Sequence, residues 1–487
     1  MIAFQQISSS LLASTTAIEN IYKKTGVTPP QQRVAMFAQY LAAKTPTNNI
    51  AISGFTSADD VAAQAGYGSQ AHLLALTYYA EAGANPAPLD WFPIADGTTA
   101  KAYTITFATN ASSQGIWRVY ILGKKYEISV ANGDTPTVSA AALAALINAD
   151  KTCPFTASPA VGVVTITANW KGLSSDLLDV RKNYYASDVN VIPSGQTMVI
   201  VSSVSGATDP SLTTALANMG NTFYTFVLTA LNDATAAGAL ETAWTARIDP
   251  LVRKPFVGVM GYVDTRANFI TALGSRNNPG STYFPVEASP SHPGQIAAAL
   301  VAVASSSAAA DASRPWTDLV LQTILPGSGP DWTYPQAQAV EVAGGSTFQY
   351  VTGGKIKILD ALTTYKTNAG GASDDSWRYP ETITNTQYKL FSADQMLSSS
   401  PFDRAKIIAD TDVAAAEYAI SPSTMKAYWH ALFDNWGLLN HSKNIQAMKD
   451  SLIVEQDGAN YGRLNVQFTD YMVAGLRVVA AQRNWSF

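Results

Sequence analysis

The sequence predicts a multidomain protein of the α/β and α+β classes, and three features support this prediction. The first is size: 487 residues, 47% apolar and 14% charged, are enough for about three domains with buried cores. The second is an alternation of strand and helix patterns over residues 198–362, which indicates a largely parallel, helix-covered sheet. The third is a stretch from Lys101 to Tyr185 in which apolar and polar residues alternate, as they do in β-strands.

The first part of the chain reads as helical. After Pro29 and Pro30, residues 31–43 place apolar side chains at helical spacing, which predicts an amphipathic helix. Ser57 is a typical N-cap for a second helix that ends at Gly66, and residues 69–82 predict a third.

Residues 96–189 are expected to form an inserted, β-rich outer domain, because strand patterns recur there between loop signals. The expected strands are residues 103–107, 117–121, 126–130 and 163–166, with one helix over residues 137–149. The α/β region that follows predicts strands at residues 198–202, 223–228, 256–260, 282–285 and 319–321. Its expected helices are residues 210–219, 234–248, 266–273 and 293–310.

The C-terminal region predicts more helices and a final extended segment. Ser421 and Pro422 are a cap and a first helical residue, and the helix they open continues through Trp436. Helical patterns also cover residues 388–397 and 442–452, and residues 463–468 alternate as a strand. Residues 476–487 are rich in apolar residues, are expected to be extended, and end on an aromatic residue.

Composition excludes several classes of partner. A net charge of −5 without blocks of like charge favours neither nucleic acid nor an anionic membrane surface. No apolar run approaches the roughly 20 residues of a spanning helix, and the first residues lack the basic start of a signal peptide. The single Cys153 excludes an intrachain disulfide, and it is expected to be a buried apolar residue in a reducing cytoplasm.

The residues do not predict an active site. Of four histidines, only His292 lies in a loop, beside Ser291, and no Gly-x-Ser-x-Gly turn or partner aspartate accompanies it. Asp374 and Asp375 are candidates for a hard cation but read more simply as a solvated turn. We therefore expect no catalytic residues, no cofactor and no metal.

Three segments carry a family resemblance. Residues 363–382, TTYKTNAGGASDDSWRYPET, follow a predicted strand; residues 273–279 read LGSRNNP; and residues 450–457, DSLIVEQD, precede RLNV at residues 463–466. In their order along the chain they resemble segments of contractile bacteriophage tail sheath proteins, in particular the Mu-like group. The resemblance covers roughly residues 67–487.

The resemblance implies a subtilisin-like-shaped α/β sheath core, built from residues 21–95 and 190–375, that carries the inserted domain. It also implies a tube-facing C-terminal domain over residues 376–471 and linking arms at residues 1–20 and 472–487. The residues expected to link subunits are Ile2, Phe4, Ile7, Leu476, Val478, Val479, Trp485 and Phe487. Charged residues expected to face the tube are Arg404, Lys406, Lys426, Lys443 and Lys449.

The implied protein is structural and not an enzyme: a helical homopolymer that surrounds a tail tube and contracts. Its implied partners are other copies, the tube protein, and the baseplate and tail terminator proteins, with no nucleic acid and no membrane insertion. The implied location is the virion tail, after assembly in the host cytoplasm. Three alternatives stay open: the sheath of a phage-derived contractile injection particle, a subtilisin-fold hydrolase, and a β-rich carbohydrate-binding protein.

Overall fold

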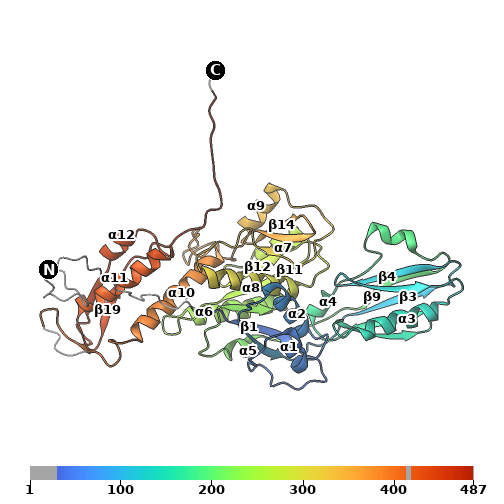
Figure 1. The fold of residues 1–487 in the computed structure, drawn as a ribbon, viewed down its shortest axis with the longest axis horizontal. Coiled ribbons are helices and arrows are strands. Elements are labelled where there is room, and N and C mark those ends of the chain that lie inside the picture. Colours follow the sequence, from blue (N-terminus) through green and yellow to red (C-terminus); the bar gives the residue numbers. More distant parts are fainter. Residues whose placement is uncertain (1–29, 413–417, 486–487) are drawn as a thin grey trace, which may run out of the picture. The chain divides into compact units, whose positions relative to one another are not determined.

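The computed structural model describes residues 30–412 and 418–485 (Figure 1). The chain divides into two compact units. In the described residues, the larger unit holds residues 30–391 and 472–485, and the smaller unit holds residues 392–471. The division falls within one helix, α10 (Pro380–Leu397).

A five-stranded parallel sheet forms the centre of the larger unit, in the order β12-β11-β10-β1-β2. Its strands are β1 (Val34–Gln39), β2 (Leu89–Ile94), β10 (Phe226–Thr229), β11 (Val257–Tyr262) and β12 (Ser281–Pro285). All their residues are buried except the last one of β11, because helices cover both faces. The prediction of a parallel, helix-covered sheet is confirmed.

The helix predicted at residues 31–43 is wrong, because this stretch forms the strand β1 next to the middle of the sheet. A strand buried on both faces is a continuous apolar run, and periodicity cannot distinguish such a run from a buried helix. The following strand β2 contains Pro93, which an edge strand tolerates.

Helices cover the two faces of the sheet in separate groups. One core cluster joins β1, β2 and β10 to helices α1 (Ala58–Ala65), α2 (Gln70–Ala82) and α8 (Pro293–Ala310). The opposite cluster contains α5 (Thr213–Ala217), α6 (Ala234–Ile248), α7 (Arg266–Leu273) and α9 (Tyr334–Val342). Among the described helices, α8 is long and apolar enough to cross a membrane, but 67% of it is buried in the protein, as in a core helix.

A second, three-stranded sheet lies in the same unit, in the order β13-β15-β14. It consists of β13 (Val320–Leu321), β14 (Thr347–Val351) and β15 (Lys355–Asp360), which pair antiparallel. The strand expected at residues 319–321 therefore belongs to this sheet and not to the parallel sheet.

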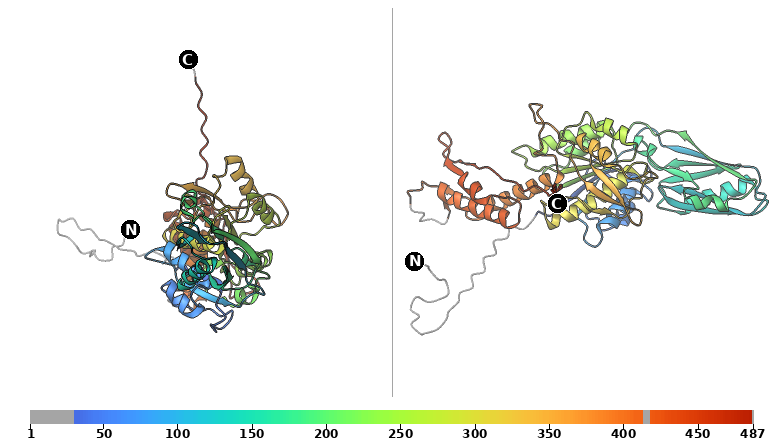
Figure 2. Two further views of the ribbon diagram at one scale, coloured as in Figure 1. Left: turned by 90° about the vertical axis from the view of Figure 1, so that its right-hand side faces the viewer. Right: turned by 90° about the horizontal axis from the view of Figure 1, so that it is seen from above.

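The β-rich module folds around its own core, with Trp170 and Ile166 fully buried, and it extends from one end of the larger unit (Figure 2). Its sheets have the orders β6-β7-β3-β9 and β5-β4-β8. The strands are β3 (Ala102–Ala108), β4 (Gly115–Ile121), β5 (Lys124–Val130), β6 (Phe155–Ala160), β7 (Val163–Ala168), β8 (Val180–Lys182) and β9 (Thr197–Val204). The helical segments are α3 (Pro136–Ala149), α4 (Leu173–Asp176) and the 3₁₀ helix η1 (Ala186–Val191).

The strand predicted at residues 198–202 was assigned to the wrong sheet. It lies within β9, which pairs antiparallel with β3 of the module, and a bridge between Thr99 and Ala207 follows. The paired strands of the module therefore extend to residue 207. Alternating apolar residues predict a strand here but do not say which sheet receives it.

The smaller unit combines helices with short strand pairs. The helices wholly within it are α11 (Pro422–Leu438) and α12 (Ile445–Asp450), and the strands are β16 (Lys406–Ile407), β17 (Ala419–Ile420), β18 (Ile453–Gln456) and β19 (Leu464–Gln467). The Ser421 cap is confirmed, because its side chain accepts from the backbone N–H of Thr424 at 3.2 Å. Trp429, Phe433 and Trp436 are buried on one face of α11, also as expected.

Candidate assembly site

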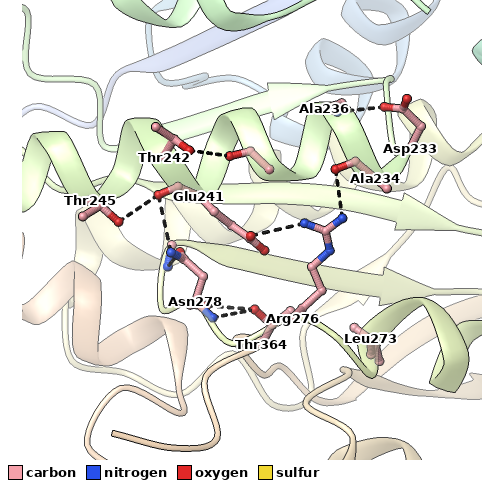
Figure 3. Close-up of polar contacts among 12 residues, drawn as sticks. Asp233, Ala234, Ala236, Glu241, Thr242, Thr245, Leu273, Arg276, Asn278 and Thr364 are labelled. Carbon is pink, nitrogen blue, oxygen red and sulfur yellow. Dashed lines mark hydrogen bonds and ion pairs between the residues drawn. The ribbon is translucent and has the colours of Figure 1, made fainter. Parts of the chain in front are cut away.

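Two of the three family-like segments pack against each other in the larger unit (Figure 3). The backbone N–H of Asn278 donates to Thr364 Oγ1, and this hydroxyl donates back to the Asn278 carbonyl, each at 3.0 Å. Asn277 Oδ1 accepts from the backbone N–H groups of Lys366 and Thr367 at 2.7 and 3.1 Å. The loop at residues 273–279 and the segment after β15 thus form one hydrogen-bonded joint.

Two basic side chains attach this joint to the surrounding helices. Arg276 Nη1 lies 3.2 Å from Glu241 Oε2 of α6, and its Nη2 donates to the Ala234 carbonyl at 2.9 Å (Figure 3). Lys366 Nζ donates to the carbonyls of Leu273 and Ala343, both at 3.2 Å, at the C-terminal ends of α7 and α9. A cation suits these carbonyls, whereas burial lowers the pKa of the Lys366 amine.

The segment continues into a contact with the C-terminal tail. Tyr379 precedes α10, and Glu381 lies in its first turn. Arg477 of the tail forms ion pairs with Glu381 and with Asp360 at the end of β15, where its Nε is 3.0 Å from both carboxylate oxygens. The guanidinium carbon also lies 3.5 Å from the centre of the Tyr379 ring. Burial raises the pKa of both carboxyl groups, against the opposing effect of the Arg477 charge.

The predicted linking residues of the tail are exposed. Leu476, Val478, Val479 and Trp485 present most of their surface to solvent, and residues 473–485 form no helix or strand. Ile2, Phe4, Ile7 and Phe487 lie outside the described residues. Exposed apolar side chains in sequence make a surface suited to contact with another chain.

The third family-like segment forms the antiparallel hairpin β18–β19 in the smaller unit. The backbone N–H of Asp457 donates to the Arg463 carbonyl at 2.9 Å, and the alternation of an antiparallel ladder then directs the backbone groups of Val454 and Val466 away from the hairpin. Within the described residues, these groups have no hydrogen-bond partner. A hollow of about 410 Å³ is lined by the same strands, and Ile453 is 55% exposed.

The charged residues expected to face the tube lie on the smaller unit in different settings. Arg404, Lys406 and Lys443 are exposed, and Lys426 is half-buried. Lys449 Nζ forms an ion pair with Asp434 at 2.6 Å, so its charge is already compensated within the unit.

His292 and Ser291 serve the fold. The His292 ring is fully buried: its Nδ1 accepts from the Gly294 N–H at 3.0 Å and its Nε2 lies 2.8 Å from the Ser174 carbonyl. A carbonyl accepts only, so Nε2 carries the proton and neither nitrogen is available as a base. Burial lowers the pKa of His292 to about 4. Ser291 Oγ accepts from the Leu325 N–H at 3.1 Å.

The acidic pair in the family-like segment at residues 363–382 closes a turn. Asp374 accepts from the Tyr365 hydroxyl at 2.6 Å and the Ser376 N–H at 2.9 Å, and these bonds lower its pKa. Asp375 lies 3.5 Å from Arg378. In the part of the chain that the structure describes, no group of three His, Cys, Asp or Glu residues is placed to hold a metal ion.

Sequence reasoning missed Arg477 and Lys366. Arg477 meets partners 117 and 96 residues away in the chain, so no local pattern marks its role. Its position between apolar residues sets it apart in the sequence, but the sequence does not show that it is largely buried or which residues it meets.

The chain is similar to a Mu-like prophage tail sheath protein over 98% of its length, so the resemblance first read from three short segments is confirmed. It is 26% identical over 487 residues to the Mu-like prophage FluMu tail sheath protein of Haemophilus influenzae, and the match covers 98% of each chain. No protein-family model matches the chain.

Two solved structures are similar. The sheath tail protein of Desulfitobacterium hafniense has a TM-score of 0.48 at 13% identity, covering 94% of this chain and all of that one. The anti-feeding prophage helical sheath in its contracted state has a TM-score of 0.49 at 10% identity, covering 97% and 99%.

Proposed function

We propose that this chain is the sheath subunit of a contractile phage tail, which polymerises as a helix around the tail tube and contracts to drive the tube through the host envelope. The observation that carries the proposal is the 26% sequence identity between this chain and a Mu-like prophage tail sheath protein, over 98% of both chains. The work of such a subunit is mechanical. Head-to-tail contacts that do not close generate a helix, and repacked contacts between rigid bodies change its length.

The domain roles follow from this proposal. The parallel-sheet region is the subtilisin-like-shaped sheath core, the β-rich module faces outward, and the smaller unit faces the tube through exposed charges such as Arg404, Lys406 and Lys443. Residues 1–20 and 472–487 are the linking arms. The exposed apolar side chains of the tail support its assignment as an arm.

The hairpin β18–β19 is the surface that we assign to receive an arm from another copy. Its outward backbone groups at Val454 and Val466 are free to pair with an extended strand, and main-chain hydrogen bonds supply the affinity in such additions. The adjoining hollow offers room for alternate side chains of the incoming strand. The further partners are the tube, baseplate and terminator proteins, met in the host cytoplasm during assembly.

Electron microscopy of the purified protein, alone and with its tube protein, tests the proposal. Regular hollow filaments of the protein, which enclose the tube when the tube is present, are the expected result. A protein that stays a discrete particle in both samples contradicts the proposal. Isolated native particles then separate a phage, which carries a DNA-filled head, from a phage-derived injection particle.

A further inference from the structure

The C-terminal tail is exposed at Leu476 and Val478, on both sides of the largely buried Arg477. The side chain of Arg477 is 12% exposed, whereas Leu476 before it is 76% exposed and Val478 after it is 79% exposed. An arginine among apolar residues of an exposed tail would ordinarily be the most solvated of them. The reversal shows that a specific contact holds the chain at this point.

The contact uses Nε, Nη2 and the flat face of the guanidinium group. One side faces Asp360 through Nε, with 3.0 Å to each carboxylate oxygen, and Nη2 reaches Glu381. Its flat face lies over the Tyr379 ring at 3.5 Å. Paired charges with additional hydrogen bonds and ring stacking are a combination for which lysine cannot substitute, because its ammonium is a point charge.

The backbone before Arg477 is also tightly placed. A Cβ added at Gly475 would come within 2.2 Å of Pro315 Cγ, so the chain lies directly against that ring with no space for a side chain. Gly475 and Arg477 thus fix a short stretch of the tail at two points. Beyond Arg477, the described residues 478–485 are all exposed.

The two carboxylates belong to structural elements of the subunit. Asp360 ends β15, and Glu381 lies in the first turn of α10, near the end of the segment (residues 363–382) that forms the joint with residues 273–279. Both side chains are largely buried, and removal of Arg477 would leave two like charges together in a poorly solvated place. Arg477 is therefore part of the subunit's fold, although it lies in the tail.

We propose that Arg477 is the anchor of the C-terminal arm: the chain up to this residue belongs to its own subunit, and the residues from Val478 onward are the part that another copy can take up. A pull on the arm then passes through Asp360 and Glu381 to β15 and α10. The role of the arm in assembly rests on the proposed sheath function, whereas the anchor is a property of the single subunit.

Trypsin offers a direct test on the full-length unpolymerised subunit, because the tail contains two arginines in different settings. Arg483 is exposed beside Trp485, and Arg477 is anchored. We expect cleavage after Arg483 to be at least about tenfold faster than cleavage after Arg477, since the latter requires local opening of the anchor. Equal rates at the two sites in the native subunit would overturn the proposal.

Substitutions sharpen this test. Arg477→Lys keeps a trypsin site but loses the pairing with both carboxylates, so cleavage at residue 477 should accelerate. The control is Asp318→Asn, which removes the exposed carboxylate of the Lys357–Asp318 ion pair and should leave the rate of this cleavage unchanged. Unchanged protection in Arg477→Lys counts against the anchor. A melting curve of each variant shows whether the subunit is folded, and the cleavage ratio within one wild-type sample decides the question even where a variant unfolds.

A pair of truncations separates the anchor from the arm. Deletion of residues 478–487 should leave the melting temperature nearly unchanged and abolish filaments, whereas deletion of residues 476–487 should also lower the melting temperature. Equal melting temperatures for the two truncations contradict the anchor. Filaments from the shorter deletion contradict the linking arm and the proposed assembly, and they leave the trypsin ratio as an independent measure of the anchor.

Discussion

The edge of β6 in the β-rich module and the hairpin β18–β19 are both antiparallel strands at the limit of a sheet, but one edge is closed and the other is open. On β6, the side chain of Asn148 bonds both backbone groups of Ala157, accepting from its N–H at 2.9 Å and donating to its carbonyl at 2.7 Å. Pro159 then offers no N–H at all. Such devices prevent a sheet edge from pairing with another chain.

The hairpin lacks these devices. Its outward groups at Val454, Gln456, Leu464 and Val466 have no hydrogen-bond partner among the described residues, and neither strand contains proline. The difference shows that side chains of the module close its β6 edge, whereas the hairpin keeps open backbone groups. The module needs nothing from outside to complete its sheet at β6, and the open groups of the hairpin are available to the added strand of the proposed assembly.

The edge strand β9 of the module is intermediate. Lys182 Nζ donates to the Met198 carbonyl at 2.6 Å, which closes one outward group. The outward backbone groups of Ile200 and Ser202 have no partner in the described part of the chain. If another chain pairs with this open edge of β9, the module also takes part in assembly, and the contrast between a closed module and an open hairpin does not hold.

The largest expected effect comes from prolines in the hairpin. Val454→Pro removes an outward N–H and should abolish filaments while the subunit keeps its melting temperature within a few degrees. Sedimentation and a melting curve measure the two properties. Wild-type filaments from this variant would contradict the hairpin as the receiving surface.

The matched control is Glu455→Pro, one residue further along β18. Glu455 pairs directly with Asn465, so its N–H belongs to the ladder within the hairpin. This variant should lose filaments and also destabilise the smaller unit, by about 3 kcal/mol for a lost ladder bond and local distortion. The difference between the two variants separates pairing between copies from pairing within one copy.

A smaller effect is expected from His292, which links α8 of the core to α4 of the module through the Ser174 carbonyl. Its pKa is about 4 in the folded protein and about 6.5 in the unfolded chain, so stability is present above pH 6.5 and is lost as pH falls toward 4. The loss should be about 3 kcal/mol at most.

Denaturant unfolding at several pH values checks this expectation. His292→Asn can still cap α8 but does not titrate, so its free energy of unfolding should vary less between pH 7 and 4. Ser291→Ala is the control and should keep the wild-type slope. The same slope in His292→Asn would show that other groups govern acid sensitivity, and both variants should form normal filaments at neutral pH.

The smallest effect on assembly is expected when the module is removed. Residues 99–207, bounded by the bridge between Thr99 and Ala207, are replaced by a short Gly/Ser linker. We expect a folded subunit, checked by circular dichroism, that forms filaments. Loss of filaments from a folded variant would break the comparison, because it would assign an assembly role to the module and its β9 edge.

Local signals predicted several helices well, although the helix expected at residues 31–43 is the strand β1 and α9 was not predicted. The ranges expected at residues 234–248, 266–273 and 293–310 agree with α6, α7 and α8, because caps and flanking loops mark their ends in the sequence itself. The cap at Ser57 is likewise confirmed. Propensity and capping depend on neighbouring residues, so the sequence carries this information directly.

Sheet membership could not be predicted in the same way. β1 pairs with β10, which lies almost 200 residues away in the chain. β9 was expected in the parallel sheet from its position in the chain, but it pairs with β3 of the module. Both outcomes depend on packing between distant segments. The candidate assembly site could likewise be predicted only in part. The apolar residues of the tail, which the structure shows to be exposed, were evident from the sequence. The Arg477 contact could not be predicted, because it depends on the folded positions of Asp360 and Glu381.

The anchor at Arg477 also fixes the point from which the reach of the C-terminal arm is measured in a proposed assembly of this chain. Residues 478–487 remain beyond it, and a fully extended chain of that length spans about 35 Å. In the proposed assembly, a strand of another copy that takes up residues 478–487 lies within this distance of Tyr379 in every state that keeps these residues bound. Bound in this way, the segment would limit how far two neighbouring subunits separate, whatever rotation they undergo.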